Sequence, residues 1–234
     1  MNRHERRKNK GKGIENNKFF LDLKNAIEVH KLKNYSEAKN IYKKLLVTHP
    51  ENYELNRHMG ILCQDTGKLE ESFDFFVKCI KKNPNGFEAY NNLGTSYVLT
   101  KNYELAVQCF NKSLSLSAQY QPAIENLASL YARRGDGENS LKYSETLLKI
   151  NPENPKAVSS YAKALVLNHN VEKAIELMED LLDKFPSDEE FQINLATAYR
   201  EIGNFAKISN LYNTPDIGAV SGETTAYKTL GLFD

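Results

Sequence analysis

Polar side chains that could bind a peptide recur along this chain at a fixed interval. The positions related by that interval are Lys24, His58, Asn92, Asn126, Ser160 and Asn194. A side-chain amide both donates and accepts hydrogen bonds, so each asparagine could pair with one peptide unit of an extended ligand. Ordinary polar residues on the outside of a helix would give the same pattern, and the spacing alone leaves both interpretations open.

No residues are spaced for catalysis. The sequence has no glycine-rich phosphate loop, no G-x-G-x-x-G and no H-E-x-x-H. Ser221 stands in V-S-G-E, which is not the G-x-S-x-G turn of a serine nucleophile. The five histidines lack the spacing of a tetrahedral metal site. Acidic pairs such as Glu189–Glu190 fall where helices are expected to start and where the helix dipole favours acids. We therefore expect no enzyme, no metal and no cofactor.

The cysteines and the hydropathy pattern favour a cytoplasmic protein. Cys63, Cys79 and Cys109 are far apart and form no C-x-x-C pair, which is typical of reduced thiols in a cytosol. They stand where related blocks of the sequence have Tyr, Leu or Ile, so we expect them to pack between helices. No apolar run approaches the ~18 residues that span a bilayer. The basic start is not followed by the apolar core of a secretory signal.

Charge is distributed unevenly over a chain of ordinary soluble composition. The 234 residues are 41% hydrophobic and 26% charged, with a net charge of +1. Residues 1–18 hold seven Lys or Arg against two Glu and few apolar side chains, which predicts a disordered basic arm. Clustered cations can bind nucleic acid by releasing counterions. The arm nevertheless lacks the interleaved aromatic residues that stack on bases.

Six blocks of equal length follow one another without insertion. They span 19–52, 53–86, 87–120, 121–154, 155–188 and 189–222, and the last is expected to end early, at 214. The eighth position of every block is Gly or Ala, and the twentieth is Ala or Ser in the first five. Each block has two runs with apolar residues at helical spacing. We predict a pair of antiparallel helices that cross at the small residues, and such pairs must stack to bury their apolar faces.

The third block carries the clearest motif, Tyr90-x2-Leu93-Gly94-x2-Tyr97 followed by Ala106-x3-Phe110. This pattern resembles the tetratricopeptide repeat (TPR) family, whose motif has a period of about 34 residues. The resemblance covers about residues 19–214. It implies an all-α fold, a right-handed superhelical solenoid of antiparallel helix pairs whose first helices line a concave groove. Residues 215–234 leave the pattern and could cap the last pair.

The resemblance also implies a function, because members of this family usually grip a partner segment in the groove. The chain is therefore similar to a non-catalytic interaction scaffold for another protein or peptide. The candidate peptide-binding residues are His58, Asn91, Asn92, Thr95, Asn126, Ser129, Ser160, Lys163 and Asn194. We hypothesise that an extended, weakly charged segment lies across Asn92, Asn126 and Asn194. Chaperone-binding members have a basic cage of which only Arg57 is present here, so that activity is not expected.

Two other functions stay open. In bacterial relatives a basic opening and such an array often precede a transferase domain. The chain could therefore be an accessory module that recruits substrates for a glycosyl-, methyl- or sulfo-transferase. The basic arm could instead make it an adaptor on nucleic acid. Self-association also stays open because the end blocks are atypical, and no membrane partner is expected.

Overall fold

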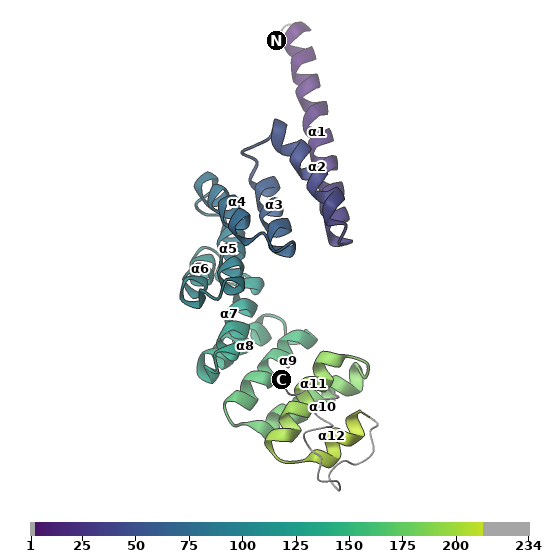
Figure 1. The fold of residues 1–234 in the computed structure, drawn as a ribbon, viewed down its shortest axis with the longest axis vertical. Coiled ribbons are helices and arrows are strands. Elements are labelled where there is room, and N and C mark those ends of the chain that lie inside the picture. The colour runs from purple at the N-terminus through teal and green to yellow at the C-terminus, as the bar shows by residue number, and fades with distance from the viewer. Residues whose placement is uncertain (1–2, 213–234) are drawn as a thin grey trace. The chain divides into compact units, whose positions relative to one another are not determined.

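The computed structural model describes residues 3–212, with side chains from Asn17 onward. This part of the chain contains twelve helices and no strand, which confirms the predicted all-α class (Figure 1). The helices are α1 (Arg3–Lys31), α2 (Tyr35–Thr48), α3 (Tyr53–Asp65), α4 (Leu69–Lys82), α5 (Phe87–Leu99), α6 (Tyr103–Leu116), α7 (Gln121–Arg133), α8 (Gly137–Ile150), α9 (Pro155–Leu167), α10 (Val171–Lys184), α11 (Glu189–Glu201) and α12 (Phe205–Leu211). The predicted C-terminal tail, 215–234, lies outside the described residues.

Helix starts repeat with the period of the sequence. The even-numbered helices begin at residues 35, 69, 103, 137, 171 and 205, and α3, α5, α7, α9 and α11 begin at 53, 87, 121, 155 and 189. Asparagine or aspartate side chains cap the first turn of several helices, for example Asn52 on the amide of Leu55 and Asp188 on the amide of Phe191. Such caps satisfy backbone donors that a helix start leaves unpaired.

The small residues lie at the helix crossings, as the sequence predicts. A Cβ atom built on Gly60 would fall 2.5 Å from Cε1 of Phe76. The equivalent atom on Gly94 would fall 2.6 Å from Cε1 of Phe110. Both rings are fully buried, so the glycines leave the space in which the rings of the following helices pack.

The turn within each helix pair has a feature that the sequence analysis did not predict. One residue in each turn has a left-handed backbone with φ between 60° and 72°, and these residues occupy the same position of every block: Lys33, Gly67, Lys101, Gly135, His169 and Gly203. Glycine adopts this conformation without steric cost, whereas a side chain with a Cβ makes it unfavourable. Three of the six turns therefore carry local strain.

The chain divides into two compact units, Met1–Ala123 and Ile124–Asp234, called unit 1 and unit 2 below. In unit 1, helices α1, α2 and α3 pack around a core that includes Phe19, Tyr42 and Leu55. In unit 2 a second core includes Met178 and Leu195. Each unit therefore has its own apolar interior, which is expected of stacked helix pairs.

Residues 3–18 differ from the disordered arm that their composition predicts, because they form the first half of α1. The second half of this helix is anchored in unit 1 by the buried side chains of Phe19 and Leu23. Starting a helix is costly, but extending one that is already formed is not. Lys, Arg and Glu are also good helix formers. Residues 3–18 have too few apolar side chains to form a core, but they can still extend a helix whose other half is packed in unit 1.

Candidate functional site

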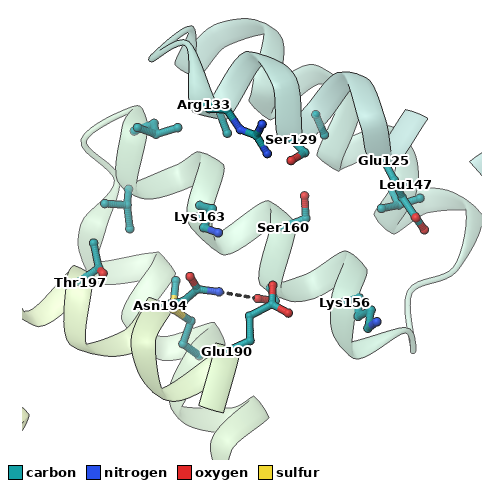
Figure 2. A pocket seen from close by; sticks show the side chains of 16 residues that line it. Glu125, Ser129, Arg133, Leu147, Lys156, Ser160, Lys163, Glu190, Asn194 and Thr197 are labelled. Carbon is teal, nitrogen blue, oxygen red and sulfur yellow. Dashed lines mark hydrogen bonds between the residues drawn. The ribbon is translucent and has the colours of Figure 1, made fainter. Parts of the chain in front are cut away.

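A groove of about 580 Å³ lies in unit 2 and is lined mainly by the first helices of three successive pairs, α7, α9 and α11 (Figure 2). The candidates that the structure brings together there are Ser129 on α7, Ser160 and Lys163 on α9, and Asn194 on α11. Ser129, Lys163 and the neighbouring Thr197 stand at the ninth position of successive blocks, so each occupies the same place on its own helix. The period of the sequence thus presents one face of each helix to a shared groove.

Apolar side chains form the floor of this groove. Leu147 of α8 and Met178 of α10 reach it from the second helices, and Ala128 lies on α7. All three side chains are buried. The walls above them carry hydroxyl, amide and charged groups, and a mostly apolar site with a few convergent polar groups is typical of ligand pockets.

A hydrogen bond between two buried side chains joins two walls of the groove. Nδ2 of Asn194 on α11 donates to Oγ of Ser159 on α9 at 2.9 Å (Figure 2). Both side chains are buried, so the bond forms away from competing water. It fixes the orientation of the Asn194 amide and links α9 to α11 at the groove.

His58 of unit 1 is used for packing. Its ring lies parallel to that of Tyr42, with centroids 6.4 Å apart. Burial and the adjacent Arg57 lower the pKa of His58 to about 4. The Arg57 guanidinium donates to Nε2 of His58 at 3.3 Å, and because a guanidinium only donates, this ring nitrogen accepts and the ring is neutral.

The other candidates of unit 1 are also engaged within their own unit. Asn91 is buried, and its main-chain oxygen accepts a hydrogen bond from the hydroxyl of Thr95 at 3.3 Å. The main-chain oxygen of Asn92 accepts from Nε2 of Gln64 at 2.8 Å. Nδ2 of Asn92 is buried without a hydrogen-bond partner among the described residues. Asn126, in unit 2, is half-buried and does not line the groove. The ladder of Asn92, Asn126 and Asn194 stays a prediction.

Two family models describe parts of this chain. Both are models of the tetratricopeptide repeat, and they match residues 131–193 and residues 87–120. The chain is a tetratricopeptide repeat protein. The first match includes most of the groove, so the candidate site of this TPR protein lies on its repeats. No curated protein sequence matches the chain.

Solved structures with the same TPR fold have low sequence identity to this chain. A tetratricopeptide repeat protein of Parabacteroides merdae is 17% identical with a TM-score of 0.68, covering 82% of this chain and 77% of that one. Pseudomonas aeruginosa pilF is 15% identical with a TM-score of 0.70, covering 82% and 88%. YrrB, reported as a TPR protein with an unusual peptide-binding site, is 16% identical with a TM-score of 0.60, covering 81% and 97%. At these identities the likeness concerns the fold alone.

The TPR groove contains charged residues that the list of candidates omits. Arg133, Lys156 and Glu190 line it, together with Glu125. Glu190 lies at the start of α11, as the sequence predicts, and the candidate positions do not include the second and thirteenth positions of the blocks. Lys156 and Glu190 both stand at the second position of their blocks, so the same period could have found them. The groove is therefore more strongly charged than the candidate positions predict.

The titratable groups of the TPR repeats do not form a metal centre in the part of the chain that the structure describes. No group of three or more His, Cys, Asp or Glu side chains lies close enough there to hold a metal ion. The three cysteines are free. Burial raises the pKa of the Cys63 thiol, and it raises the pKa of Cys79 to about 12 and the pKa of Cys109 to about 11. Such thiols are poor nucleophiles at neutral pH. Of the described helices, none is both long and apolar enough to cross a membrane.

Proposed function

We propose that this chain is a non-catalytic interaction scaffold that binds an extended segment of a partner protein in the groove of unit 2. The observation that carries the proposal is the groove itself, about 580 Å³ in volume and lined by three successive first helices. This volume falls within the range of about 300–1,000 Å³ that is usual for ligand sites. Arrays of repeats commonly use such continuous surfaces to bind partners.

The groove is preformed, which lowers the entropy cost of binding a flexible segment. Its floor is buried, and the bond from Asn194 to Ser159 holds two of its walls together. A preformed site loses little conformational entropy on binding, so more of the contact energy contributes to affinity. The hydroxyls of Ser129 and Ser160 can each donate and accept, which suits the peptide units of an extended chain.

We place this scaffold in the cytoplasm. Its three cysteines are unpaired thiols, which are typical of reducing compartments. The alternative functions, substrate recruitment for a transferase and an adaptor on nucleic acid, stay predictions.

Peptide selection on the full chain tests the proposal. A library of random peptides, displayed on phage through their C-termini, is panned on the immobilised protein, and an enriched peptide is synthesised for titration. Ser129 is exposed and lines the groove, so Ser129→Trp fills the groove without disturbing the core. The matched control is Thr146→Trp, at an exposed residue of α8 outside the groove.

We expect Ser129→Trp to weaken binding of the enriched peptide by about tenfold or more, as a loss of about 1.4 kcal/mol implies. Thr146→Trp should bind as the unaltered chain does. If panning enriches no peptide, or if Ser129→Trp binds as tightly as its control, the proposed groove function is wrong.

A further inference from the structure

Two cations that enter the groove have no partner among the described residues. Arg133, in the last turn of α7, and Lys163, on α9, both point toward the centre of the groove (Figure 2). Neither takes part in a hydrogen bond or an ion pair with the described side chains. Elsewhere in unit 2, Lys184 and Lys207 are paired with carboxylates at 2.7 and 2.6 Å. The groove therefore contains two cationic side chains that form no ion pair with a carboxylate of the described residues.

Hydroxyl groups lie beside these cations. Ser129 is four residues before Arg133 on the same helix, and Ser160 is three residues before Lys163, so each hydroxyl shares a helix face with one cation. Figure 2 shows the two serines facing each other across the groove. A carboxylate accepts up to about four hydrogen bonds and binds a guanidinium with both oxygens. These four side chains supply donors of that kind from two walls.

The half of the groove away from Arg133 and Lys163 carries more negative than positive charge. Glu125 and Glu190 line it against a single lysine, Lys156. Glu125 is eight residues before Arg133 on α7, which at the rise of a helix separates the two by about 12 Å. The charge therefore changes sign along the axis of α7. An acidic group is attracted to the half that contains Arg133 and repelled by the half that contains Glu125.

We propose that the groove selects segments with an internal aspartate or glutamate, whose carboxylate binds between Arg133 and Lys163. This inference rests on the proposed function, because it names the side chain that the bound segment must carry. The cations lie on the first two of the three helices, and the groove continues past them to Asn194 and Thr197 on α11. The partner chain thus has room to extend beyond the acidic residue, which favours a side-chain carboxylate over a C-terminal one.

Charge reversal in the same panning experiment tests the selectivity. The variant Arg133→Glu/Lys163→Glu reverses both groove cations. The control Lys142→Glu/Lys149→Glu makes the same change in net charge at two lysines of α8 that do not line the groove. Because the displayed peptides have no free C-terminus, they offer only side-chain carboxylates.

We expect the unaltered chain and the control to enrich Asp or Glu at one peptide position, and the groove variant to lose that preference and enrich Lys or Arg. In titrations with a synthetic selected peptide, replacing its acidic residue by the matching amide should weaken binding to the unaltered chain about tenfold. The same replacement in the peptide should change its affinity for the variant Arg133→Gln/Lys163→Gln very little.

The outcomes separate the two proposals. If no peptide is enriched on the unaltered chain, the proposed function itself is wrong. If peptides are enriched without an acidic preference, or if the preference survives reversal of both groove cations, the carboxylate site is wrong and the scaffold function stands. If the selected synthetic peptide binds with a free C-terminus but not as its C-terminal amide, the assignment to an internal side chain is also wrong.

Discussion

Substituting Gly94 by alanine tests whether the close crossing of α5 and α6 depends on the missing side chain. The new Cβ would lie 2.6 Å from Cε1, 2.7 Å from Cδ1 and 3.1 Å from Cζ of Phe110. These distances are shorter than ordinary carbon contacts, which lie near about 3.5–4.0 Å. The ring is fully buried, so it has no solvent-exposed space into which it can turn.

Two opposing effects determine the size of the change. Adding a methyl group to a well-packed core costs about 1–3 kcal/mol, and three ring atoms in close contact favour the upper half of that range. Replacing glycine by alanine inside a helix contributes about 1 kcal/mol in the other direction. We therefore expect Gly94→Ala to lower the free energy of unfolding by about 1–2 kcal/mol.

Unit 2 suggests a compensating change. Ala162 and Met178 occupy the same two positions two blocks later, and both are buried in one core. A flexible methionine can make room for the methyl group that a rigid ring excludes. The double variant Gly94→Ala/Phe110→Met should therefore be more stable than the sum of its single variants predicts, by about 1 kcal/mol or more.

The assay is urea unfolding followed by circular dichroism, with hydrogen exchange of the α5 and α6 amides as a local measure because repeat arrays can unfold in parts. If Gly94→Ala stabilises the chain by about 1 kcal/mol, helix propensity alone decides the outcome. The proposed clash with Phe110 would then be absent.

Three further perturbations follow from the described contacts. Lowering the pH should destabilise unit 1 through His58. Burial lowers the pKa of His58 in the folded chain to about 4, against 6.5 in the unfolded chain. The contribution of His58 to the free energy of unfolding is therefore complete above pH 6.5 and is lost as the pH falls toward 4. The loss should reach up to about 3 kcal/mol, and urea unfolding of His58→Gln should lack that part of the pH dependence. Ser159→Ala leaves the buried amide of Asn194 without its acceptor, so urea unfolding should report a loss of about 1–3 kcal/mol. Adding Asn194→Leu should recover much of it, and equal stability of Ser159→Ala and the unaltered chain would contradict this role. Lys101→Gly relieves a side chain at φ 61° and should raise the free energy of unfolding by about 0.5–1 kcal/mol, whereas a decrease would mean that the turn carries no strain.

Helix pairing could be predicted from the sequence because it depends on short-range patterns. Apolar residues at helical spacing fix which face of each helix is buried, and small residues such as Gly60 and Ala128 mark where helices approach closely. These constraints return in every block, so each block supports the interpretation of the others. The starts of α2 to α12 follow that period through the described chain.

The left-handed turns show where a sequence pattern fails. Gly67, Gly135 and Gly203 are visible in the sequence as turn residues, but Lys33 and His169 occupy the same position with φ of 61° and 60°. Packing of the two flanking helices imposes the turn, and the residue adopts it whether or not it is glycine. Glycine would therefore mark only half of these positions.

The candidate site was predicted only in part. By itself, the sequence determined that the chain is a TPR array and that the ninth position of each block lies on the same face of its first helix, because both depend on helical period. Only the tertiary structure decided that Asn194 turns its amide to Ser159, that His58 packs as a neutral ring, and that Arg133 and Lys163 enter the groove without partners among the described residues. Hydrogen bonds, pKa shifts and ion pairs depend on distances between side chains far apart in the sequence. Those distances exist only once the helices have packed.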